Sequence, residues 1–114
     1  MSRIPIRIAS PSKYRAKRTQ GYASAKEANR AAELKLMERE GLITNLRDQV
    51  RFTLLPPFPQ RGFSRPLVYV ADFVYVDKET GKERIEDVKG MRTPVYLVKR
   101  RLMAQILGLE VTEV

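Results

Sequence analysis

A ten-residue stretch, Leu67-Val68-Tyr69-Val70-Ala71-Asp72-Phe73-Val74-Tyr75-Val76, is apolar at every position except Asp72 and determines the fold. Its apolar side chains fall on both alternating faces, which is typical of a central strand covered on both sides. Turn-forming residues 77–82 follow, and residues 83–89 are predicted to return as the second strand of a hairpin. Because a buried ionised carboxylate costs several kcal/mol unless it is compensated, Asp72 requires a cation or hydrogen-bond donors.

The segment before this hairpin is predicted to hold a helix and a strand. From Ser24 to about residue 40, alanine and leucine recur at helical spacing, and Gly41 is a natural stop. The helix begins with an S-x-x-E capping box formed by Ser24 and Glu27. Residues 49–54 alternate between polar and apolar, which indicates a half-buried strand. The proline-rich residues 56–66 then predict a loop.

The segment after the hairpin is predicted to form a second helix and a last strand. Thr93 followed by Pro94 is a favourable helix start, and the helix should run to about Leu107, before Gly108. Residues 109–114 alternate again. The predicted order is therefore α-β-β-β-α-β, an α/β fold with a mixed sheet of about four strands flanked by two helices. We expect one domain over residues 23–114.

Residues 1–22 form a basic arm with six lysines and arginines and no acidic residue. Such an arm can be a disordered terminus or can contact phosphates, and the two interpretations are compatible. The whole chain holds 22 Lys and Arg against 13 Asp and Glu, a net charge of +9, which favours a polyanionic partner such as nucleic acid.

Composition excludes several kinds of chemistry. The chain has no cysteine and no histidine, so disulfides, thiolate zinc sites and histidine-based catalysis are ruled out, and an enzyme would have to use carboxylates and lysine. No segment reaches the roughly 18 consecutive apolar residues of a membrane span, and the start lacks the apolar stretch of a signal peptide. We expect a cytoplasmic protein that does not bind membranes.

The alternation of the hairpin strands selects candidate site residues. Asp72 is expected to share its face with Val74, and Asp87 to share its face with Lys89, while Glu86 points the other way. Since cross-strand neighbours lie about 5 Å apart and diagonal ones about 7–8 Å, both aspartates would reach one cation, and two carboxylates with waters suit Mg²⁺ or Mn²⁺. Lys89 would stand beside the ion as a point charge, an arrangement suited to metal-assisted phosphodiester hydrolysis.

Each of these residues also has a structural interpretation. Asp72 can form an ion pair with Lys89 across the hairpin. Asp87 can lie on an exposed edge strand, where charges prevent edge pairing. Glu27 can serve only as part of the capping box. Residues 99–101 are basic and favour a solvated helix face, with phosphate contact as a secondary interpretation.

An aspartate in a strand, a hairpin turn and then (D/E)-x-K, with a glutamate on a preceding helix, resembles the PD-(D/E)XK nuclease superfamily. Ala71 departs from that pattern, because proline often stands at its position. The segments 23–27, 48–52, 69–73 and 86–90, with Thr93 and Lys99, are similar to small endonucleases encoded by phages and prophages, which are themselves similar to Holliday-junction resolvases of the phage endonuclease I type. The resemblance covers residues 22–114.

The resemblance implies a restriction-endonuclease-like core and a role for each matching residue. Asp72 would be the central metal ligand, Asp87 the second and the Val88 carbonyl a further one; Glu27 would reach a second metal or a metal-bound water, Lys89 would be the catalytic lysine, and Gln49 would hold a water or phosphate. Either one or two metal ions are compatible with this set.

The expected function is that of a Mg²⁺- or Mn²⁺-dependent endodeoxyribonuclease that leaves 5′-phosphate ends and acts on branched DNA in a phage-infected or prophage-bearing bacterial cell. A junction has two strands to cut, so a C2 homodimer is expected. The residues expected to contact DNA are Arg15, Lys17, Arg18, Arg61, Arg65 and Lys99. The alternatives are a non-enzymatic basic DNA-binding module and a nuclease for single strands, flaps or RNA.

Overall fold

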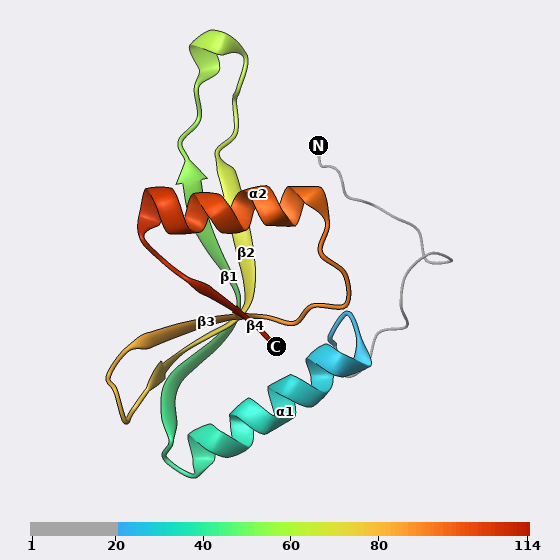
Figure 1. Ribbon diagram of the computed structural model, residues 1–114, viewed down its shortest axis with the longest axis vertical. Helices are drawn as coiled ribbons and strands as arrows, with labels where there is room; N and C mark the ends of the chain where they lie inside the picture. The colour runs from blue at the N-terminus through green and yellow to red at the C-terminus, as the bar shows by residue number, and fades with distance from the viewer. Residues whose placement is uncertain (1–20) are drawn as a thin grey trace.

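The computed structural model describes residues 21–114 and contains two helices and one four-stranded sheet (Figure 1). The elements are α1 (Ala25–Arg39), β1 (Ile43–Leu55), β2 (Leu67–Asp77), β3 (Glu83–Asp87), α2 (Pro94–Leu102) and β4 (Val111–Glu113), with a 3₁₀ turn, η2 (Pro59–Arg61), and a π-helical turn, η3 (Met103–Leu107). This α-β-β-β-α-β order confirms the predicted α/β fold. Within the described residues, no helix is long and apolar enough to cross a membrane.

The sheet is mixed and has the order β1-β2-β3-β4. β1 pairs antiparallel with β2, β2 pairs antiparallel with β3, and β3 pairs parallel with β4. β2 and β3, the two strands that carry the candidate aspartates, are therefore both interior strands.

Two strand boundaries differ from the sequence prediction. β1 begins at Ile43, earlier than the predicted residue 49. The pattern misses residues 43–48 because Asn45 and Gln49 adopt left-handed φ values of 57° and 51°, which interrupt the polar–apolar alternation that marks a strand. β3 ends at Asp87, two residues early, because the N–H of Val88 donates to the carboxylate of Asp72 at 2.8 Å.

Both helices begin at the predicted caps. The Ser24 hydroxyl accepts a hydrogen bond from the N–H of Glu27 at 3.1 Å, and the Thr93 hydroxyl accepts one from the N–H of Tyr96 at 3.1 Å. After α2 the chain continues through the π-helical turn η3 to Gly108. Figure 1 shows α2 crossing the β1–β2 hairpin and α1 running beside the start of β1.

The core consists of two clusters, and the two neighbours of Asp72 in β2 belong to different ones. One contains Tyr69, Ala71 and Val74 of β2 together with residues of α2 and β4, and the other contains Phe73 and Tyr75 with residues of α1. Strict alternation would place Ala71 and Phe73 on one face, so the alternation of β2 breaks between them. The break places Asp72 at the boundary between the two clusters.

Candidate functional site

Asp72 and Asp87 meet where the β2–β3 ladder opens. The last paired residues are Phe73 and Glu86, and Asp72 and Asp87 lie one step further along the two strands. Oδ2 of Asp72 accepts the Val88 N–H at 2.8 Å, and the carboxyls of the two aspartates are close enough to share a hydrogen bond when one is protonated. The structure thus brings together the two residues that the sequence selects as metal ligands.

Asp72 is an unfavourable place for a negative charge in the metal-free protein. Burial is the largest cause that raises the pKa of its carboxyl, and the hydrogen bond from the Val88 N–H lowers it. With the negative charges of Asp87 and Glu27 and a hydrogen bond to Asp87, which also raise it, the pKa is about 7. A positive ion beside Asp72 would relieve both the burial and the repulsion.

Asp87 is buried, with 5% of its surface exposed, and is held on both oxygens. The Tyr69 hydroxyl donates to Oδ2, and the Lys89 ammonium lies 2.8 Å from Oδ1. Burial and the bond to Asp87 raise the pKa of Tyr69 well above its usual value. The Lys89 ammonium also lies 3.8 Å from the centre of the Tyr96 ring, so an ion pair and a cation–π contact fix its position.

Glu27 and Gln49 complete the site from α1 and β1. The Gln49 side-chain amide donates to Oε2 of Glu27 at 3.3 Å and more weakly to Oδ1 of Asp72 at 3.5 Å. Glu27 is buried, with 8% exposed. The left-handed backbone of Gln49 breaks the regular course of β1 at the residue that makes these two contacts. A cleft of about 270 Å³ opens here, lined in part by Glu27, Gln49, Asp48 and Asp72.

Two structural interpretations of the sequence are wrong. Among the described residues, Lys89 pairs with Asp87 and forms no ion pair with Asp72. β3 is paired on both sides, so Asp87 does not lie on an exposed edge strand. Glu27 does follow the N-cap serine, as expected of a capping box, but its carboxylate also contacts Gln49.

The other predicted residues lie elsewhere. Arg61 and Arg65 are in the β1–β2 loop and Lys99 is on α2. Arg15, Lys17 and Arg18 lie outside the described residues. The N–H of Val88 donates to Asp72, and the role of the Val88 carbonyl as a metal ligand stays a prediction.

Sequence reasoning missed three contacts of the site. Tyr69 and Tyr96 support Asp87 and Lys89, and Lys26 donates to the Lys89 carbonyl at 2.7 Å. Tyr69 lies three residues before Asp72 in the same strand, so strand alternation alone places it on the opposite face. Only the break at Asp72 brings its hydroxyl to Asp87.

The donor set is compatible with a hard divalent cation. Carboxylate oxygens are the ligands that Mg²⁺ and Mn²⁺ prefer, and the mutual repulsion at Asp72 favours a cation between the acids. Within residues 21–114, however, no three acidic side chains are already arranged to hold one ion. Asp72 and Asp87 therefore offer two protein ligands, and the Gln49 side-chain amide links Glu27 to Asp72 by donating to both carboxylates.

Comparison with known proteins identifies one family. A family model described as "Protein of unknown function (DUF1064)" matches residues 11–111, which include every site residue named above. No curated protein and no solved structure matches the chain.

Proposed function

Because the chain belongs to the DUF1064 family, whose function is unknown, we propose its function from its own residues: it is a metal-dependent endodeoxyribonuclease that hydrolyses phosphodiester bonds. The observation that supports this proposal most directly is the pair of carboxyls formed by the half-buried Asp72 and the buried Asp87, with the Lys89 ammonium 2.8 Å from Asp87. The net charge of +9 suits a DNA substrate.

Each residue of the site would have a separate role in hydrolysis. Asp72 and Asp87 would hold Mg²⁺ or Mn²⁺, with Glu27 reaching a second ion or a bound water. When present, the ion would polarise the phosphate and lower the pKa of a bound water. Lys89 would stabilise the negative charge that develops on the phosphate, because its ammonium is already fixed beside the carboxylates. Gln49 would orient a water or a phosphate oxygen between Glu27 and Asp72.

This arrangement resembles the PD-(D/E)XK nucleases, and that likeness favours products with 5′-phosphate ends. We propose branched DNA, such as a Holliday junction of phage recombination, as the substrate, and a homodimer that cuts two strands symmetrically. The likeness is supported by the order of the elements, in which the glutamate-bearing helix α1 precedes the β2–β3 hairpin that carries both aspartates.

The proposal is tested by measuring DNA cleavage by the variant Asp72→Asn. Asparagine keeps the side-chain volume and can still accept the Val88 N–H, so fold and DNA affinity should remain while Mg²⁺- or Mn²⁺-dependent cleavage is lost. Asp77→Asn is the matched control, because Asp77 ends the same strand and caps the turn through an oxygen that asparagine retains. Near wild-type cleavage by Asp72→Asn would refute the proposal, and DNA binding without cleavage by the wild-type chain would favour a non-enzymatic DNA-binding module.

Substrate structure requires a separate comparison. Cleavage rates on four-way junctions, flaps, duplexes, single strands and RNA of matched sequence would separate a junction resolvase from other nucleases. We expect the four-way junction to be cut fastest. Faster cutting of single strands, flaps or RNA would support the proposed nuclease activity but contradict branched DNA as its substrate.

A further inference from the structure

The β1–β2 loop forms a rigid projection, which we call the finger and define as residues 55–67. Phe58 and Phe63 exchange two backbone hydrogen bonds, of 2.7 Å and 3.0 Å, and the 3₁₀ turn η2 closes the tip with Gly62 at a φ of 89°. Four prolines among residues 56–66 restrict the backbone further. Figure 1 shows the finger extending beyond α2. The hydrogen bonds and prolines therefore restrict the backbone of the tip before any partner binds.

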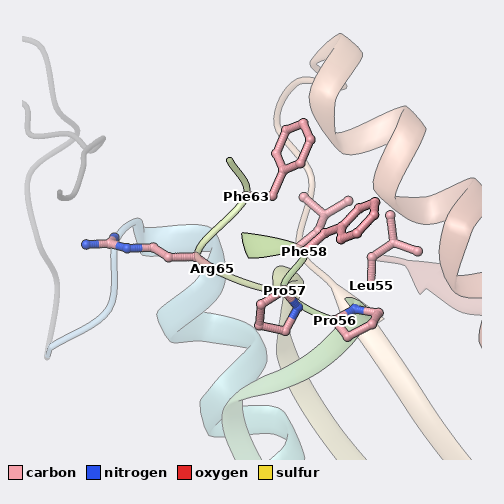
Figure 2. A pocket seen from close by; sticks show the side chains of 7 residues that line it. Leu55, Pro56, Pro57, Phe58, Phe63 and Arg65 are labelled. Atoms are coloured by element: carbon pink, nitrogen blue, oxygen red, sulfur yellow. The ribbon is translucent and has the colours of Figure 1, made fainter. Parts of the chain in front are cut away.

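The finger exposes two aromatic rings on one side. Phe58 is 51% exposed and Phe63 is 64% exposed, and residues directly opposite in an antiparallel pair place their side chains on the same face. The rings border an apolar hollow of about 680 Å³, which is in the size range of small-molecule sites and exceeds what one base needs. Figure 2 shows the rings on one side of the finger and Arg65 extending away from them.

Positive charge is concentrated in the sequence of the finger and in the segment that contains α2. Residues 49–71 contain Arg51, Arg61 and Arg65 and no acidic residue, and residues 88–109, which include α2, contain five basic residues and no acidic one. Among the residues that the structure describes, none of these three arginines forms an ion pair. In residues 88–109, by contrast, Lys89 pairs with Asp87, and Arg92 and Arg100 pair with Glu113. Exposed rings beside arginines that form no ion pair, as in the finger, are typical of surfaces that stack bases and neutralise phosphates.

We propose that the finger binds branched DNA by stacking Phe58 and Phe63 on an unpaired base, with Arg61 and Arg65 at the flanking phosphates. This inference rests on the proposed function and deepens it. A second copy of the chain is a less suitable occupant, because it would bring the same positive charge and because prolines oppose strand-to-strand pairing. From Leu67 to Asp72 the strand spans about 17 Å, roughly five base-pair steps, so the finger would meet DNA away from the cleaved bond.

Phe63→Trp in the full chain tests the proposal, because the chain has no tryptophan of its own. The variant is mixed in EDTA with a forked oligonucleotide that has single-stranded arms, or with a duplex of equal length, and binding is followed by anisotropy of the labelled DNA. We expect the fork to quench the tryptophan fluorescence at saturation, and the duplex to quench it much less. Leu36→Trp, on the exposed part of α1, is the matched control and should not be quenched.

Phe63→Leu separates stacking from general apolar contact. Leucine keeps an apolar side chain but removes the ring, so affinity for the fork should fall about 5- to 150-fold, the range expected for one lost stacked base. Unchanged tryptophan fluorescence on saturated fork, or unchanged affinity of Phe63→Leu, would overturn the proposal. A fluorescence change that depends on protein concentration without DNA, with a dimer in sedimentation that Phe63→Ser abolishes, would instead assign the finger to a second copy.

The two proposals can fail separately. If the fork quenches the fluorescence of Phe63→Trp but the wild-type chain does not cleave DNA with Mg²⁺ or Mn²⁺, the proposed nuclease activity is rejected and DNA binding by the finger is supported. If Asp72→Asn abolishes cleavage but the fork does not change the tryptophan fluorescence of Phe63→Trp, the proposed nuclease activity is supported and base stacking by the finger is rejected. A chain that binds no DNA would reject both.

Discussion

Asp72 and Asp87 lie one step beyond the last paired residues of β2 and β3, and their carboxyls are close enough to share a hydrogen bond. The ladder opens there because the Val88 N–H donates to Asp72 instead of to the backbone of β2. The fold therefore holds two acids together against their repulsion. Such an arrangement costs stability in the metal-free protein and favours a bound cation.

Mg²⁺ or Mn²⁺ should raise the melting temperature of the wild-type chain. An ion that binds only the folded state stabilises it by mass action, by about 2.7 kcal/mol when its concentration is 100 times the dissociation constant. Differential scanning fluorimetry with increasing Mn²⁺ measures the effect. The double variant Asp72→Asn/Asp87→Asn should lose it, while Asp77→Asn should retain it. Equal shifts in all three proteins would indicate nonspecific ion binding.

The contribution of Asp72 to the stability of the metal-free protein should decrease as the pH rises from about 4 to about 7. Burial raises the pKa of Asp72 to about 7 in the folded state, from an ordinary 3.8 in the unfolded chain. The folded state therefore binds more protons in this window, and its stabilising contribution is complete below pH 3.8 and lost as the pH passes through about 7.

Asp72→Asn isolates this contribution, because asparagine does not titrate. The free energy of unfolding of Asp72→Asn minus that of the wild type, measured by urea denaturation in EDTA, should increase from pH 5 to pH 8. Asp77→Asn provides the reference for substitution at a neighbouring acidic position. A difference that stays constant over this range would contradict the raised pKa.

Local pattern predicted most of the fold but not the contacts that complete the site. Capping at Ser24 and Thr93 depends on residues close in sequence, so it could be predicted. The early start of β1 could not, because the left-handed backbone at Asn45 and Gln49 hides its alternation. The bond between Tyr69 and Asp87 joins two strands across a break that no local pattern reveals.

Glu86 and Asp87 are adjacent but should have different roles. Glu86 is 2% exposed, receives two hydrogen bonds from Arg30 at 2.7 and 2.8 Å, and accepts one from the Tyr75 hydroxyl, whose pKa burial raises to about 12. Arg30→Met leaves this buried carboxylate without its cation, so it should destabilise the protein by about 3 kcal/mol in urea denaturation.

The double variant Arg30→Met/Glu86→Leu should recover much of that loss, because an apolar pair replaces the buried ion pair. The fraction that remains folded should still cleave DNA, whereas Asp87→Asn should fold and fail to cleave. Arg39→Met, at the exposed end of α1, controls for loss of a helix arginine. Loss of cleavage in the folded double variant would place Glu86 in the active site.

Lys89→Met should separate charge stabilisation from metal binding. The Lys89 ammonium lies 2.8 Å from Asp87 and 3.8 Å from the centre of the Tyr96 ring, so its charge is held beside the proposed ion rather than bound to it. Removing a fixed charge that stabilises a transition state costs about 10²–10³ in rate, so cleavage should fall by that factor. The Mn²⁺-dependent shift in melting temperature should remain, because both carboxylates are still present. Lys82→Met, in the exposed turn between β2 and β3, should cleave normally. A lost metal shift in Lys89→Met would mean that Lys89 maintains the ligand geometry instead of acting on the phosphate.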